Sequence, residues 1–94
     1  MKVWVEGMDG GNLSRVNVFS SAENAIGYWR REFGLSDEMV DCLKDDAMAM
    51  LSGTSSSASI GLCKFIDGIG TVFLSAVPVD VDSYYERINK TEKA

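Results

Sequence analysis

Apolar side chains cluster in two short runs at the start of the chain, with turn-forming residues between them. The runs are residues 2–8 and 13–19, and the stretch 9–12 that separates them contains two adjacent glycines. A two-residue turn at its central glycines would set Val5 opposite Val16, which makes a favourable apolar cross-strand pair. The pattern therefore predicts a β-hairpin in this register.

Two amphipathic helices are predicted by the spacing that follows. Ser20 and Glu23 have the spacing of a capping box at a helix start, and Gly34 is placed to end that helix in a left-handed conformation. Its apolar positions recur at intervals of three and four residues, as a buried stripe requires. They are Ala22, Ala25, Ile26, Trp29 and Phe33.

The second predicted helix runs between Ser36 and Gly53. Ser36 is a favourable N-cap, and Asp37 and Glu38 fall in the first turn, where the helix dipole favours negative charge. The apolar stripe of this helix consists of Val40, Leu43, Ala47, Met50 and Leu51. The serine-rich stretch 54–59 is typical of a connection.

A second β-hairpin is predicted after this connection. Residues 60–66 and 71–77 are rich in β-branched and aromatic side chains and flank a glycine-containing turn. A two-residue loop at Gly68-Ile69 sets Phe65 opposite Val72. The turn contains a GxG sequence, but a strand follows it where a dinucleotide site requires a helix.

These elements predict an α+β fold in the order ββααββα. Two hairpins separated by two helices join most simply into one four-stranded antiparallel sheet, with both helices packed on one face. Asp82 or Ser83 is placed to cap a short C-terminal helix that carries Tyr84 and Tyr85. The 94 residues, 46% of them hydrophobic, fit a single domain over residues 1–94.

The composition favours a soluble, cytoplasmic protein. No apolar run approaches the roughly 18 residues that a membrane helix needs, and Glu6 comes too early for a signal peptide. Cys42 and Cys63 lack the CxxC spacing of zinc ligands, so we expect no metal and two free, mostly buried thiols, as suits a reducing compartment.

The absence of histidine argues against an enzyme. Histidine is the commonest general base and metal ligand near neutral pH, and this chain contains none. We therefore expect no catalytic set and no cofactor. The net charge of −5 also argues against direct nucleic-acid binding, because proteins that contact phosphates gain affinity through clustered Lys and Arg. A basic protein partner fits this charge better.

An acidic stretch on the second predicted helix is the first candidate binding surface. Asp37, Asp41 and Asp45 recur every four residues, an arrangement that costs an isolated helix roughly 0.2–0.5 kcal/mol per like-charge pair. Glu38 and Asp46 widen the negative strip. A basic surface that normally holds DNA or RNA would compensate this cost, while the plainer interpretation is a solvated helix face that keeps the protein soluble.

An apolar sheet face is the second candidate surface. In the expected registers, one face collects several large apolar side chains from both hairpins, too many to leave in water. Its candidate contact residues are Trp4, Leu62 and Phe73, joined by Tyr84 of the C-terminal helix. We expect this face to be covered by the C-terminal helix, by a second copy of the chain in a homodimer, or by a foreign partner.

The sequence thus favours a non-enzymatic binding module. A small acidic inhibitor that docks on a basic, nucleic-acid-binding surface is the leading hypothesis. This profile is shared by anti-CRISPR proteins, other phage inhibitors of bacterial defence, and toxin-immunity proteins. A self-associating accessory or structural subunit is one alternative, and a domain that binds a small molecule between sheet and helices is another.

Overall fold

The computed structural model describes residues 2–10 and 13–81 of the chain. It contains a four-stranded antiparallel sheet and two helices, as the sequence predicts. The elements are β1 (Lys2–Gly10), β2 (Leu13–Phe19), α1 (Ala22–Phe33), α2 (Asp37–Leu51), β3 (Ile60–Ile66) and β4 (Gly70–Asp80). The predicted C-terminal helix lies outside the described residues.

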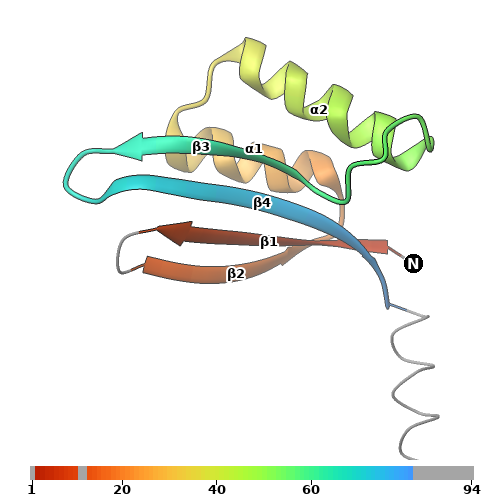
Figure 1. Ribbon diagram of the computed structural model, residues 1–94, viewed down its shortest axis with the longest axis horizontal. Coiled ribbons are helices and arrows are strands. Elements are labelled where there is room, and N and C mark those ends of the chain that lie inside the picture. Colours follow the sequence, from red (N-terminus) through yellow and green to blue (C-terminus); the bar gives the residue numbers. More distant parts are fainter. Residues whose placement is uncertain (1, 11–12, 82–94) are drawn as a thin grey trace, which may run out of the picture.

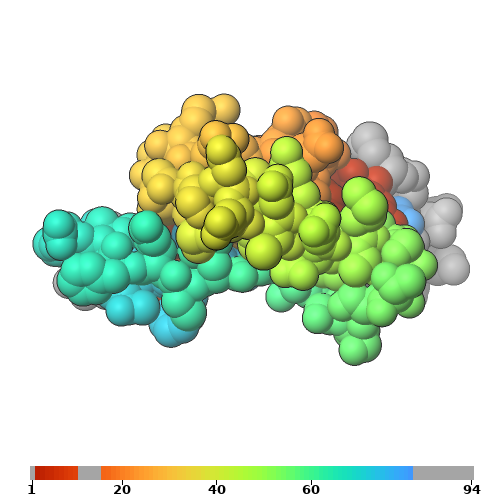
Figure 2. All heavy atoms as spheres, turned by 90° about the horizontal axis from the view of Figure 1, so that it is seen from above, coloured from red at the N-terminus to blue at the C-terminus, as the bar shows by residue number. Residues whose placement is uncertain are grey.

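The strand order is β2-β1-β4-β3, so the two hairpins lie side by side and join through β1 and β4. Both helices lie on the same side of the sheet (Figure 1). Viewed from the helix side, α1 and α2 lie over the middle of the sheet, and the turn end of the β3–β4 hairpin extends past them (Figure 2). The sheet therefore has one face covered by helices and one that neither helix covers.

The first helix forms where the sequence predicts, with one difference at its start. Ser21, rather than Ser20, is the N-cap, because the Ser21 side chain accepts a hydrogen bond from the Asn24 backbone N–H. The helix ends at Gly34, whose φ of 64° is the left-handed conformation that glycine adopts without steric cost. Trp29 and the rest of the predicted stripe face the sheet, with Phe33 only partly buried.

The second helix also begins as predicted. The Ser36 side chain accepts a hydrogen bond from the Met39 backbone N–H, and Asp37 and Glu38 lie in the first turn. Val40, Leu43 and Ala47 are buried, whereas Leu51 at the end of the predicted stripe is 53% exposed. One side of α2 thus packs on the domain and the other faces solvent.

The core lies between the helices and the covered face of the sheet. Its largest fully buried side chains are Trp29, Ile26, Ile60, Leu74, Glu6 and Val72. Glu6 is the ionisable residue among these six, and its hydrogen bonds offset the free-energy cost of burying a polar side chain. Its carboxylate accepts from Trp29 Nε1 at 2.9 Å and from Asn17 Nδ2 at 3.2 Å. Helix α1 is therefore tied to β1 by a buried polar contact as well as by packing.

The predicted register of the first hairpin is wrong by two residues. Val5 lies opposite Val18 rather than Val16, and Gly10 pairs with Leu13, so β1 continues through the first glycine. A Cβ atom on Gly10 would lie 2.6 Å from the Thr71 carbonyl oxygen, so this glycine permits a close approach of β4 rather than a turn. A two-residue shift leaves each side chain on its predicted face.

The predicted register of the second hairpin is wrong by one residue, which has a larger consequence. Phe65 lies opposite Thr71 rather than Val72, because the connection holds three residues between Ile66 and Gly70. Gly68 and Gly70 have φ values of 83° and 106°, so both glycines take part in this longer turn. A one-residue slip moves every side chain of the shifted strand to the other face of the sheet relative to its partner strand.

Candidate functional site

The solvent-facing side of α2 presents the acidic residues that the sequence singles out. All of them are exposed and come from one helix: Asp37, Glu38, Asp41, Asp45 and Asp46. We call this set the acidic ridge. At a rise of about 1.5 Å per residue, it extends for about 13 Å along the helix. The structure brings the predicted acidic residues together on one surface.

Little within the described chain neutralises the acidic ridge. The Arg30 guanidinium donates to the Asp37 carboxylate, so the end of α1 pairs with the first turn of α2. Within residues 2–10 and 13–81, the other four acids of the ridge form no ion pair. Lys44, on the same helix, is exposed and makes no ion pair with them in the same part of the chain.

The placement of the ridge along α2 separates acids that stabilise the helix from acids that do not. Asp37 and Glu38 lie in the first turn, where the helix dipole attracts negative charge. Asp41, Asp45 and Asp46 lie beyond that turn, where the dipole gives them no such benefit, and the last turn contains no basic residue. Helix stability therefore accounts for only the first part of the ridge.

The second surface is the uncovered side of the sheet. The pairing of the strands puts a set of apolar side chains on this side: Val3, Val5, Val16, Val18, Cys63, Phe65, Phe73, Val77 and Val79. We call it the open face. Val16 is 71% exposed, Phe65 67% and Phe73 56%, so water contacts large apolar side chains across several strands.

The sheet face predicted from the sequence is divided between the two sides. Trp4 is buried beneath the helices, with only 3% exposed, and Leu62 packs against the same core. Phe73 lies on the open face, because the second hairpin has the longer turn. These three residues therefore do not form one contact surface. Tyr84, the fourth member, lies outside the described residues.

The cysteines also differ from expectation. Cys42 and Cys63 are both exposed and not bonded to each other. Cys42 lies on the outer side of α2 between residues of the acidic ridge, and Cys63 lies on the open face opposite Phe73. Small apolar residues are more often buried, but here one thiol lies on each candidate surface.

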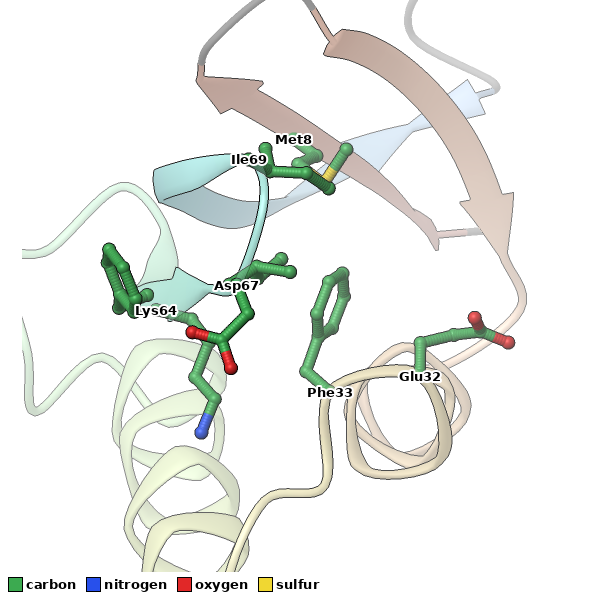
Figure 3. A pocket seen from close by; sticks show the side chains of 8 residues that line it. Met8, Glu32, Phe33, Lys64, Asp67 and Ile69 are labelled. Atoms are coloured by element: carbon green, nitrogen blue, oxygen red, sulfur yellow. The ribbon is translucent and has the colours of Figure 1, made fainter.

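A shallow groove of about 470 Å³ lies where the β3–β4 hairpin extends past α1. Figure 3 shows Phe33 and Glu32 at the end of α1 on one side and Lys64 and Asp67 of the hairpin on the other. Apolar side chains make up most of its lining, with the charged groups at intervals around it. The groove is open, and it is the nearest feature to the small-molecule cleft considered from the sequence.

The described residues provide no metal centre. Within residues 2–10 and 13–81, no three His, Cys, Asp or Glu side chains converge in a way that could hold an ion. The acids of the ridge lie along one helix surface and do not wrap around a point, as ligands of Ca²⁺ or Mg²⁺ do. Among the same residues, no helix is both long and apolar enough to cross a membrane.

Comparison with known proteins gives no family. The chain matches no protein-family model, no curated protein and no solved structure. Function therefore has to be inferred from the two surfaces themselves. The spacing of acidic residues in the sequence was enough to identify the acidic ridge. The residues of the open face can be identified only when the register of the second hairpin is known. The buried carboxylate of Glu6 has a sequence signal, since it alternates with Trp4 and Met8 on the inward side of β1.

Proposed function

We propose that this protein is a non-enzymatic inhibitor that docks its acidic ridge on the basic, nucleic-acid-binding surface of a larger protein. One observation carries the proposal: the acids of α2 form a continuous exposed ridge, and four of them have no ion pair within the described residues. Like charges held four residues apart disfavour a free helix. When a basic partner binds, the same carboxylates would contribute favourably, through attraction to its positive charges.

The geometry of the ridge supports a partner that normally follows a nucleic-acid backbone. Asp37, Asp41 and Asp45 repeat about every 6 Å along the helix axis, because four residues rise by about that distance. A surface with clustered Lys and Arg binds phosphates through such a series of point charges. The ridge would occupy the same positive groups and compete with the nucleic acid. Inhibitors of bacterial defence nucleases and toxin-immunity proteins act on partners of this kind.

The test is a charge-reversal pair with a matched control. The double variant Asp41→Lys/Asp45→Lys changes the middle of the ridge, and Glu23→Lys/Glu32→Lys makes the same change in net charge on α1. Partners are captured from the native host with each protein, and the Kd of the captured partner is measured with and without competing nucleic acid. We expect the ridge variant to lose at least about a hundredfold in affinity, roughly 1.4 kcal/mol per reversed charge.

The control variant and the competing nucleic acid decide the outcome. The α1 control should keep its affinity within about threefold, because Glu23 and Glu32 lie outside the ridge. Nucleic acid should displace the protein from its partner. Equal affinity of the ridge variant at low salt would remove the proposal, since screening is weakest there. Equal losses in both variants would show dependence on net charge alone, and the ridge would then have no specific role.

A further inference from the structure

The open face has more apolar surface than a solvent-facing sheet normally retains. Residues that pair across neighbouring strands form rows that cross the sheet. One such row consists of Val18, Val5 and Val77. Asp9, Phe73 and Cys63 form a second row nearer the β3–β4 turn, with Phe65 beyond it. Antiparallel sheets with one solvated face usually alternate apolar and polar residues, so this face indicates a contact surface.

The arrangement of large and small residues on the open face allows it to pack against the same face of a second copy. Between the valine row and the aromatic residues lies a row that begins with Val16 on β2 and continues through three small residues, Gly7, Ser75 and Gly61. Gly61 has no alternative, because a Cβ atom there would lie 2.6 Å from the Leu74 carbonyl oxygen. These three small residues, which we call the hollow, thus lie in the row next to the exposed side chain of Phe73. A two-fold axis brings each protrusion of one copy over the hollow of the other.

The charge distribution also allows two copies to meet here. Of the described residues whose side chains are placed on this side of the sheet, Asp9 is the charged one, and it pairs with Phe73 across β1 and β4. The acidic ridge lies on α2, on the opposite side of the molecule. Two chains with a net charge of −5 can therefore join through the open face without burying either acidic ridge, and Asp9 is the one carboxylate per copy that the described residues place on this face.

The available area suits a weak but specific dimer. Strands of 7 to 11 residues, with about 3.3 Å per residue and about 4.8 Å between strands, give a sheet face of roughly 500 Å² per copy. Two copies would bury roughly 1,000 Å² or somewhat more, the size of weak and transient interfaces. We therefore expect association at micromolar concentration.

We propose that the open face is the interface of a homodimer, in which two sheets pack face to face and the helices lie outside. The two sheets would form a sandwich about 10 Å apart, as aligned sheets do. Phe73 and Phe65 of each copy would fill the Gly7–Ser75–Gly61 hollow of the other. Both acidic ridges would remain on the outside, so the dimer would present two copies of the surface proposed to bind the partner.

The first experiment is sedimentation velocity of the full chain from low to high micromolar concentration. We expect a concentration-dependent dimer for the natural sequence and a monomer throughout for Val18→Lys. Met48→Lys is the matched control, because Met48 is 67% exposed and Val18 is 63% exposed, but Met48 lies on α2. Circular dichroism checks that each variant is folded. A natural chain that stays monomeric at high micromolar concentration overturns the proposal.

The second experiment uses the two natural thiols as position markers. Cys63 lies on the open face, and Cys42 lies on the outer side of α2 and serves as the internal control. Alkylation of each thiol is followed by mass spectrometry at low and high protein concentration. When nine-tenths of the chain is dimeric, Cys63 should react about tenfold more slowly, because only the monomer exposes it. The rate at Cys42 should not change.

The pattern of thiol protection also distinguishes other occupants of the face. A dimer in which Cys63 stays fully reactive would associate through a different surface, such as the β3 edge, and would contradict the proposal. A monomer in which Cys63 is protected at every concentration would place residues 82–94 of the same chain on the face. That result would contradict it too. Neither result bears on the acidic ridge, since Asp41→Lys/Asp45→Lys tests that surface separately.

Discussion

The two faces of the sheet are built from the same four strands, yet they differ in what they contribute. The covered face joins Trp4, Leu74 and Ile60 to the helices and contains the buried Glu6 contact. The open face places Val16, Phe65 and Phe73 in water. Apolar content alone therefore does not identify the core of this protein. The core forms on the side of the sheet that the helices cover. The apolar side chains on the other side are available for binding.

The largest expected effect is on the covered face. Trp29→Ala removes a fully buried indole and its hydrogen bond to Glu6, and should lower the free energy of unfolding by about 3–5 kcal/mol. Total stabilities are about 5–15 kcal/mol, so the variant should melt far earlier. Phe65→Ala is the aromatic control on the open face. It should change stability by less than about 0.5 kcal/mol at concentrations where the chain is monomeric. Urea unfolding followed by circular dichroism checks both.

The buried carboxylate gives the next effect. Glu6→Leu keeps a similar side-chain size but removes both acceptor oxygens. The Trp29 indole N–H and the Asn17 amide then each lose the acceptor that Glu6 provides. We expect a loss of about 1–3 kcal/mol in the free energy of unfolding, the cost of a buried donor without its acceptor. Glu23→Leu, on the exposed side of α1, is the control. Equal stability of the two variants would contradict the structural role given to Glu6.

Salt should separate the two binding surfaces by the sign of its effect. Raising ionic strength from about 0.01 M to about 1 M shortens the Debye length from about 30 Å to about 3 Å. Binding through the acidic ridge should weaken by about tenfold or more, while dimerisation through the open face should hold or strengthen, as repulsion between two acidic chains is screened. Partner Kd and dimer Kd measured over the same salt series test this. A parallel weakening of both would refute an apolar dimer interface.

The smallest effect concerns a single methyl group. Val16→Thr keeps the shape of the side chain but places a hydroxyl on the open face, where Val16 is 71% exposed. We expect the stability of the monomer to stay within about 0.5 kcal/mol. The dimer Kd should rise several-fold, because the hydroxyl loses water in the interface. Thermal melts of dilute protein and sedimentation of concentrated protein give the two values. A large loss of stability in the dilute protein would show that the residue belongs to the fold.

Much of the fold could be predicted because local signals agree with one another. Ser36 is typical of a helix N-cap, and Gly34 is typical of a helix C-cap. The apolar residues of α1 around Trp29 follow the helical period. The acidic ridge followed from residue spacing on α2 alone. These features depend on neighbours within one element, so the sequence contains all the information they need.

The strand registers could not be predicted for a physical reason. Residues 9–12 contain two adjacent glycines, and the sequence does not show that Gly10 serves a close approach to Thr71. In the second hairpin both sides of β4 are apolar, with Val72 and Leu74 on one side and Phe73 on the other. The pattern therefore does not oppose a one-residue slip. The open face followed only when the turn length was known.

The deep position of both indoles has a practical consequence for spectroscopy. Trp4 and Trp29 are almost entirely shielded from water on the helix side of the sheet. Their fluorescence emission should be blue-shifted in the folded protein and should report on the integrity of the interior. Events on the outer side of α2 or on the far side of the sheet should leave that emission unchanged. A dye on Cys42 would then follow one surface, a dye on Cys63 the other, and the intrinsic signal would monitor the domain between them.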